Sequence, residues 1–214
     1  MTDRVIILGA GGHARVLAEI LWLQSYDILG YTDRVSSRLL KLPTGEPINY
    51  LGADDVLLQY ETCCVCLVNG LGGTGSPTRR KELFERMKGS GHQFSSVIHT
   101  AAVISPSAAL AEGVQVMAGA VIQTGSRLGC NTIVNTKASV DHDCEIGRHV
   151  HIAPGATLSG AVVVEDGVHI GVGATVIQGI RIGANSLVGA GAVVVRDVPP
   201  GVKVVGVPAR EVPW

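Results

Sequence analysis

The triplet Asp141-His142-Asp143 is the part of the sequence best suited to acid–base chemistry. A carboxylate beside an imidazole fixes the tautomer of the ring and stabilises the imidazolium, as a general base requires. We therefore take His142 as a candidate general base, with a neighbouring carboxylate on each side of it in the sequence. The alternative interpretation is a solvated surface cluster with no catalytic role.

Spacing adds a partner to this triplet. Gly160 follows His142 by 18 residues, and His169 follows His151 by the same interval. In a fold that repeats every 18 residues, each pair would stack. Gly160 would then leave space above the imidazole and bare a backbone amide that can hold the oxyanion of a tetrahedral intermediate. His151 and His169 would stack on another face.

A glycine-rich loop near the N-terminus has the spacing of a phosphate-binding turn. Gly9-Ala10-Gly11-Gly12-His13 follows the strand-like run Arg4–Leu8 and precedes an amphipathic stretch from Ala14 to Gln24. Such a loop brings backbone amides close to a diphosphate at a helix N-terminus, as in a Rossmann fingerprint. The domain is too short for two mononucleotide halves, so a single nucleotide diphosphate fits better than NAD.

The elements that position this loop belong to a small α/β domain, which we expect over residues 1–95. Asp27–Thr32 reads as a second strand, Cys63–Val68 as a third, buried strand, and Thr78–Lys88 as a helix. Alternating strands and helices predict a mostly parallel sheet flanked by helices. The thiols in the third strand would behave as small hydrophobes, and the five cysteines lack the paired spacing of a zinc site.

A different pattern governs residues 96–198. Starting at Ile98, every sixth residue is aliphatic up to Val194, without a slip. This period predicts a solenoid of short strands and corners, the hexapeptide parallel β-helix. The aliphatic residues point inward, small residues turn the corners, and residues 18 apart stack at the strand spacing of about 4.8 Å. The hand of the helix does not follow from the pattern.

Composition excludes several classes of function. The chain has 214 residues and a formal net charge of −1, with no block of Lys or Arg that suggests a nucleic-acid or membrane surface. Apolar runs are too short to span a bilayer, and the N-terminus lacks the features of a signal peptide. We therefore expect a cytoplasmic protein without membrane insertion or nucleic-acid partners.

The whole chain resembles one group of hexapeptide transferases, the sialic acid O-acetyltransferase-like and nucleotide-amino-sugar N-acetyltransferases. The motifs that carry the resemblance are Gly9–His13, Asp141-His142-Asp143, Val150–Gly155 and Val205–Arg210. The resemblance implies a left-handed β-helix, acetyl-CoA as cosubstrate, no metal, and a homotrimer with active sites between subunits. It also implies that His142 is the base and that Asp143 polarises it.

The resemblance assigns further roles residue by residue. His151 would lie near the cofactor thioester, Asn135 near the amino sugar, and residues 199–214 along the coenzyme A site. Asn69, Gly70 and the loop Gly72–Pro77 would form a rim of the sugar-nucleotide site. The expected cofactor-binding residues are His151, Gly160, Val172, Ala190, Pro208 and Arg210, and the expected substrate-binding residues are Gly11, Gly12, His13, Asp33, Arg34, Asn69, Gly70 and Asn135.

The expected reaction is acetyl transfer from acetyl-CoA to the 4-amino group of a GDP- or UDP-linked 4-amino-4,6-dideoxy sugar, such as GDP-perosamine, for surface glycan biosynthesis. Three alternatives stay open. One is O-acetylation of sialic acid or another sugar. The second is a metal enzyme of the γ-carbonic anhydrase type, for which His151 and His169 would be the ligands. The third is a non-catalytic trimeric scaffold that binds a nucleotide-sugar.

Overall fold

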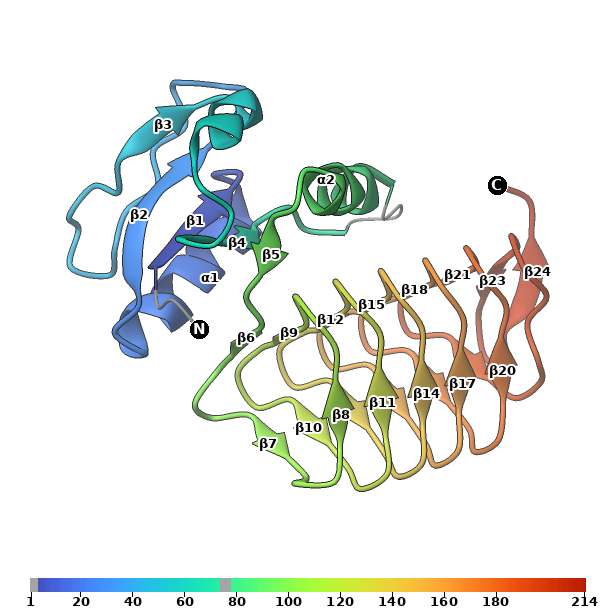
Figure 1. Cartoon of the computed structure of the whole chain (residues 1–214). Coiled ribbons are helices and arrows are strands. Elements are labelled where there is room, and N and C mark those ends of the chain that lie inside the picture. The colour runs from blue at the N-terminus through green and yellow to red at the C-terminus, as the bar shows by residue number, and fades with distance from the viewer. Residues whose placement is uncertain (1–3, 74–77) are drawn as a thin grey trace. The chain divides into compact units, whose positions relative to one another are not determined.

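A computed structural model of the protein describes residues 4–73 and 78–214. The chain divides into two compact units (Figure 1). One comprises Met1–Gly72 with Arg79–Val97, and the other comprises Gly73–Thr78 with Ile98–Trp214. No helix among the described residues has the length and apolar character needed to cross a bilayer.

The first unit is built on a parallel sheet of five strands in the order β3-β2-β1-β4-β5. The expected strands at its centre are present, and two short edge strands join them. Leu17 and Leu21 of the first helix are fully buried, because apolar residues recur on one face of the helix at helical spacing. The elements are β1 Arg4–Leu8, α1 Gly12–Leu23, β2 Asp27–Thr32, β3 Tyr50–Gly52, the 3-10 helix η1 Asp54–Gln59, β4 Cys66–Asn69, α2 Thr78–Gly89 and β5 Gln93–Phe94.

The interpretation of Cys63–Val68 as one buried strand is wrong at its start. The strand begins only at Cys66, and Cys63 and Cys64 are exposed. The amide of Cys64 donates to the carbonyl of Glu61 at 3.0 Å, which closes a turn just before the strand. An apolar run alone cannot distinguish such a turn from the strand that follows it.

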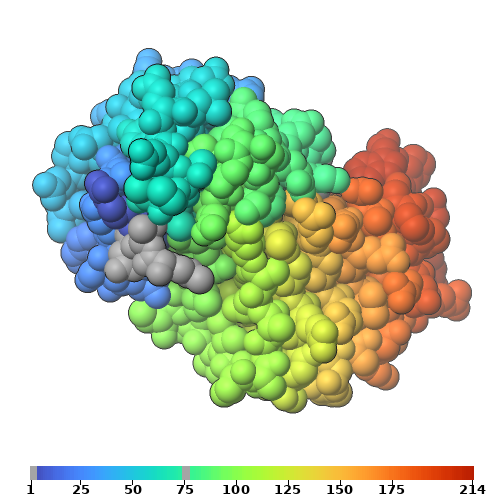
Figure 2. Space-filling view, in the orientation of Figure 1, coloured from blue at the N-terminus to red at the C-terminus, as the bar shows by residue number. Residues whose placement is uncertain are grey.

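The second unit is a parallel β-helix of two-residue strands, as the six-residue period predicts. Residues 18 apart pair in parallel, for example Val140 with Leu158 and Ile152 with Ile170. The aliphatic residue of each hexapeptide points into the prism, where most of these side chains are fully buried. In the space-filling view, successive coils appear as adjacent bands from green to red (Figure 2).

The coils stack into three flat sheets, which we call faces one, two and three. Face one consists of β6 Val97–Ile98, β9 Gln115–Val116, β12 Ile133–Val134, β15 His151–Ile152, β18 His169–Ile170, β21 Leu187–Val188, β23 Lys203–Val205 and β24 Arg210–Val212. Face two consists of β7 Val103–Ile104, β10 Val121–Ile122, β13 Ser139–Val140, β16 Thr157–Leu158, β19 Thr175–Val176 and β22 Val193–Val194. Face three consists of β8 Ala109–Leu110, β11 Arg127–Leu128, β14 Glu145–Ile146, β17 Val163–Val164 and β20 Arg181–Ile182.

From Gly113 to Gly191, each corner of the prism turns through one residue with a positive φ. This residue is the third after the inward aliphatic one, and from Gly113 to Gly191 it is most often Gly, Asn or Asp. These are the residues that tolerate the left-handed region best. Asp143 occupies such a position with φ 56°. Its backbone conformation is therefore imposed by the corner and not by the neighbouring histidine.

Candidate active site

His142 and Asp143 form a hydrogen-bonded pair at a corner between faces two and three. His142 Nδ1 lies 2.9 Å from Asp143 Oδ2, and both side chains are more than half exposed. In the neutral imidazole, Nδ1–H donates to the carboxylate and Nε2 keeps its lone pair for a proton. The hydrogen bond to Asp143 raises the pKa of His142, and the negative charges of Asp141 and Asp143 add to this effect.

Gly160 stacks against His142, as the 18-residue spacing predicts. The amide of Ala161 donates to the carbonyl of His142 at 2.9 Å, so the two corners are adjacent in the stack. A Cβ added at Gly160 would lie only 2.4 Å from His142 Nε2. The imidazole itself therefore fills the space that we expected Gly160 to leave for a thioester. Glycine at this position leaves room for the ring against the next coil.

Replacing Asp143 with Asn tests the pair through the pH dependence of catalysis. Asn tolerates the left-handed corner but carries no charge, so the pKa of His142 should fall. Because the base must be neutral to accept a proton, the rising limb of kcat/KM against pH should move to lower pH. Any titration of the substrate is common to wild type and variant, so the difference between their profiles reports His142.

The control for this experiment is Asp141→Asn. Asp141 raises the pKa of His142 through its charge alone, and this effect ranks below the hydrogen bond to Asp143. The shift should therefore be smaller in Asp141→Asn than in Asp143→Asn. Identical profiles for wild type and Asp143→Asn would contradict the role of this carboxylate.

His151 and Asn135 form a second polar pair, on face one and its corner with face two. Asn135 Nδ2 lies 3.1 Å from His151 Nε2, and Asn135 Oδ1 accepts from the amide of Thr136 at 2.8 Å. These contacts orient the Asn135 amide so that it donates to His151. The other ring nitrogen, Nδ1, hydrogen-bonds the carbonyl of Gly73. His151 is thus a buried, fixed imidazole with both nitrogens engaged.

His169 stacks on His151 as predicted, with ring centroids 4.9 Å apart in an edge-to-face arrangement. Burial lowers the pKa of His169. Among the described residues, neither histidine joins a group of three or more His, Cys, Asp or Glu side chains that could hold a metal ion. The engaged nitrogens of His151 also argue against the metal-enzyme alternative, which needs a free lone pair on the ring.

The expected residues of the β-helix lie at two different corners of one chain. His142, Asp143 and Gly160 lie between faces two and three, whereas Asn135 belongs to the corner between faces one and two. Exposed Val172 and Ala190 stack at this second corner, where the amide of Gly191 donates to the carbonyl of Val172 at 2.8 Å. Pro208 and Arg210 are exposed near the C-terminus, and Arg210 begins β24. Face two separates the two groups.

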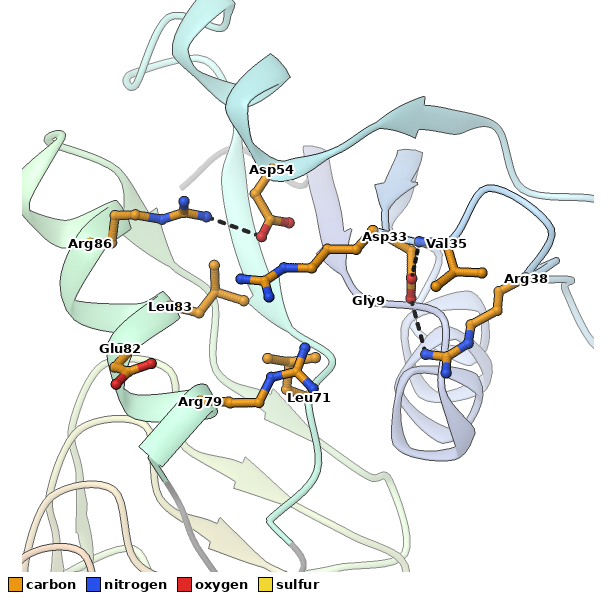
Figure 3. A pocket seen from close by; sticks show the side chains of 11 residues that line it. Gly9, Asp33, Val35, Arg38, Asp54, Leu71, Arg79, Glu82, Leu83 and Arg86 are labelled. Atoms are coloured by element: carbon orange, nitrogen blue, oxygen red, sulfur yellow. Dashed lines mark hydrogen bonds and ion pairs between the residues drawn. The ribbon is translucent and has the colours of Figure 1, made fainter.

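The α/β unit contains a cavity of about 510 Å³ at the carboxyl ends of its central strands (Figure 3). Arg86 reaches Asp54 at 3.0 Å, and Arg38 lies 3.7 Å from Asp33. Among the described residues, Arg34 and Arg79 make no ion pair, so their charges are available to an anionic ligand. The lining residues are Gly9, Asp33, Arg34, Val35, Arg38, Asp54, Leu71, Arg79, Glu82, Leu83 and Arg86.

Sequence reasoning found Asp33 and Arg34 but missed the contributions of α2. The available signal was the spacing of Arg79, Glu82 and Arg86, which puts all three on one helical face. Asp54 was missed because the strand before it, β3, has only three residues.

Asp33 is engaged in holding the glycine loop. Its Oδ2 accepts from the amide of Ala10 at 2.8 Å, and its Oδ1 accepts from the amide of Val35 at 2.8 Å. Only 8% of Asp33 is exposed, which leaves a narrow route to a ribose. Gly9 adopts φ 97°, a conformation that favours glycine, while Gly11 and Gly12 face open space.

The rim formed by Asn69 and Gly70 is fixed by a buried arginine. Arg80 Nη1 donates to the carbonyl of Asn69 at 2.7 Å and to that of Leu71 at 2.6 Å. Asn69 Nδ2 returns a hydrogen bond to the carbonyl of Arg80 at 3.0 Å. A Cβ at Gly70 would lie 2.7 Å from the carbonyl oxygen of Leu8, so the rim packs tightly on the sheet.

His13 is another expected part of the sugar-nucleotide site, and it lies against Gly72. His13 is partly exposed, and its Cβ would lie 3.5 Å from a Cβ added at Gly72. Of the expected rim loop Gly72–Pro77, residues 74–77 lie outside the described residues.

Each of the two units has relatives among known protein families. The PglD N-terminal domain family matches residues 4–87, and the bacterial transferase hexapeptide family (six repeats) matches residues 125–160. A GDP-perosamine N-acetyltransferase of Escherichia coli O157:H7 is 36% identical over 71 residues, which span 33% of this chain and 32% of that protein. The chain therefore aligns with about a third of the length of this relative.

Several solved structures match over nearly their whole length, among them PerB and the acetyltransferase domain of PglB. PerB from Caulobacter crescentus, solved with CoA and GDP-perosamine, is 38% identical over 98% of this chain and 97% of its own, with a TM-score of 0.88. The acetyltransferase domain of PglB from Neisseria gonorrhoeae, solved with acetyl coenzyme A, is 34% identical over 99% of this chain and 100% of its own, with a TM-score of 0.89.

These matches define the class as that of the hexapeptide-repeat acyltransferases, and they confirm the expected Rossmann-like domain followed by a left-handed parallel β-helix. Within this class, the chain belongs to the acetyltransferase family of PerB and the PglB acetyltransferase domain. The expectation of an acyltransferase is likewise confirmed.

Proposed function

We propose that the protein transfers an acetyl group from acetyl-CoA to the 4-amino group of a nucleotide-linked 4-amino-4,6-dideoxy sugar, of the GDP-perosamine type. The observation that carries this proposal is the His142–Asp143 pair, exposed at a corner with Gly160 packed beneath the ring. The arginine-lined cavity of the α/β unit supports a nucleotide diphosphate as the part of the substrate that this unit binds. The ligands of PerB and the PglB domain support both substrates.

The reaction needs no covalent enzyme intermediate and no metal. The lone pair of the amine attacks the thioester carbonyl carbon, and a negative charge develops on the carbonyl oxygen. The amide of Gly160, which has no acceptor among the described residues, is our candidate donor to this oxyanion. His142 Nε2 accepts the proton lost by the amine. The C–S bond then breaks, and the coenzyme A thiolate leaves and takes the proton from His142.

Other residues would bind and orient the substrates. We propose that Val172 and Ala190 border the pantetheine arm and that the extension 199–214, with Pro208 and Arg210, borders the nucleotide of coenzyme A. Asn135, fixed by His151, would contact the amino sugar. In the α/β domain, residues 1–95, the glycine loop with His13 would face the diphosphate or the sugar, and Arg34 would approach the base and ribose.

The two separated corners support an active site shared between copies of the chain. Face two is well suited to self-association because its outward side chains carry no charge, whereas face three displays Arg127, Glu145 and Arg181. We propose a cytoplasmic homotrimer in which the His142 corner of one copy meets the Val172 corner of the next. The outward residues of face two are Val103, Val121, Ser139, Thr157, Thr175 and Val193.

Mixing two inactive variants tests this sharing. His142→Ala removes the base, and Val172→Glu places a charge at the other corner. Each variant alone should be inactive. Co-expressed in equal amounts and randomly assembled as trimers, they should recover about a quarter of wild-type activity, since one site in four then has both corners intact. Failure to recover activity in verified mixed trimers would contradict a shared site.

Release of free thiol from acetyl-CoA tests the function itself. The acceptor panel consists of UDP- and GDP-linked 4-amino-4,6-dideoxy sugars, sialic acid and serine, with His142→Ala assayed beside wild type. We expect release only with a nucleotide-linked amine, reduced in the variant by about 10²–10⁴-fold. Turnover of sialic acid alone would indicate the O-acetyltransferase alternative. Nucleotide-sugar binding without any acetyl-CoA binding would indicate a scaffold.

A further inference from the structure

The turn before β4 brings together three side chains that the proposed reaction does not use. Glu61, Cys63 and Cys64 offer one carboxylate and two thiols, all exposed, with donor atoms within 4.8 Å of one another. The three side chains lie within four consecutive residues, and the backbone hydrogen bond between Cys64 and Glu61 closes the turn that brings them together. Thiolates and a carboxylate are ligands that favour zinc and its heavier relative cadmium.

The distances between the three donor atoms fit one face of a tetrahedron. The two sulfurs lie 3.5 Å apart, and Glu61 Oε2 lies 3.4 Å from Cys64 Sγ and 4.0 Å from Cys63 Sγ. A tetrahedral zinc ion with ordinary bond lengths separates two sulfurs by about 3.8 Å and a sulfur from an oxygen by about 3.6 Å. Shifts of a few tenths of an ångström would therefore complete three ligands, with the fourth position open to water.

A disulfide between the two thiols is a poor alternative use of this turn. Adjacent residues in a trans peptide have Cα atoms about 3.8 Å apart, whereas disulfides need at least about 4.4 Å.

The hydrogen bonds with Cys63 and Glu61 raise the pKa of Cys64 to about 11, so the thiol is protonated at neutral pH. A thiol must lose its proton to bind a metal ion, so cation binding at this turn would release a proton.

We propose that Glu61, Cys63 and Cys64 form a surface site for a thiophilic divalent cation of the zinc class. The site lies where the chain enters β4, at the amino edge of the parallel sheet. The cavity of the same unit lies at the carboxyl edge, beside Gly9, Asp33 and Leu71. The cation therefore takes no part in acetyl transfer, and this proposal does not depend on the proposed function.

Titration with Cd²⁺ tests the site. The full chain, reduced and without a purification tag, is titrated while the thiolate-to-metal charge-transfer absorbance is recorded in the near ultraviolet. We expect saturation at one Cd²⁺ per chain, displacement by Zn²⁺, and protection of two thiols from a thiol reagent. Cys63→Ser and Cys64→Ser should abolish the band, and Glu61→Gln should weaken binding by about tenfold.

The matched control is Cys130→Ser, a partly buried cysteine of the β-helix unit that should leave the titration unchanged. Because Cys63 and Cys64 are exposed, their serine variants should keep wild-type circular dichroism and acetyl transfer. The proposal is overturned if wild type shows no band with micromolar Cd²⁺, if the band survives in the Cys63→Ser/Cys64→Ser double variant, or if Cys130→Ser removes it.

Discussion

Gly160→Ala should lose nearly as much activity as His142→Ala while keeping the fold. The added methyl would lie 2.4 Å from Nε2 and 2.5 Å from Cε1 of His142. Gly160 does not adopt a positive φ, so alanine meets no backbone strain. The exposed imidazole can swing away at little cost to the fold, and the base is then misplaced. We expect kcat/KM to fall by about 10²–10³-fold, within the range for loss of a general base.

A double-mutant cycle separates this mechanism from a general structural effect. If Gly160→Ala acts by displacing His142, adding it to His142→Ala should cost almost nothing further. If the two effects multiply, Gly160 acts independently of the ring, as an oxyanion donor with disturbed geometry would. Thermal denaturation should show both single variants within a few degrees of wild type, since neither changes the inward-facing residues.

Arg80→Met should destabilise the α/β unit, whereas Arg79→Met should weaken nucleotide binding without loss of stability. Arg80 is 3% exposed and donates to two carbonyls, that of buried Asn69 and that of partly buried Leu71. Methionine fills much of the same volume but leaves these acceptors without their donor. Each such loss typically costs about 1–3 kcal/mol, so we expect the free energy of unfolding to fall by about 2–5 kcal/mol.

The neighbouring arginine provides the matched control. Arg79 is exposed, lines the cavity, and makes no ion pair among the described residues. Its replacement should leave the midpoint of urea denaturation unchanged and raise the Kd for the nucleotide, measured by calorimetry, by about tenfold. Equal destabilisation by the two substitutions would show that burial of Arg80 is not what holds the rim.

Burial also lowers the pKa of Arg80 to about 9, so the side chain stays charged at neutral pH.

Much of this architecture can be predicted from the sequence because the residues that determine it are close together in the chain. The six-residue period fixes which residue points inward, and stacking at 18 residues then places Gly160 against His142 without further information. Arg4–Leu8 and Asp27–Thr32 are strands with the expected bounds, since turn residues flank each run of β-formers.

Other features depend on partners that no local pattern reveals. A charged residue such as Arg80 reads as solvent-exposed until the carbonyls of Asn69 and Leu71 are placed beside it. The two-residue strand β5 is too short to show a period. Cys63 and Cys64 share an apolar run with β4, and only the hydrogen bond across the turn separates them from it. Asp33 likewise looks available to a ribose until the amides of Ala10 and Val35 are seen to occupy its carboxylate.

The β-helix has two repeat lengths, the hexapeptide of six residues and the coil of 18 residues. An insertion of six residues between His142 and Gly160 would preserve the aliphatic period and hence the packed interior. It would, however, carry Gly160 on to the next corner and leave the imidazole facing some other residue. An insertion of a whole coil, 18 residues, would return Gly160 to the original corner, but one coil farther from His142. The packing of the interior therefore depends on the six-residue repeat, whereas the contact between His142 and Gly160 depends on the 18-residue repeat.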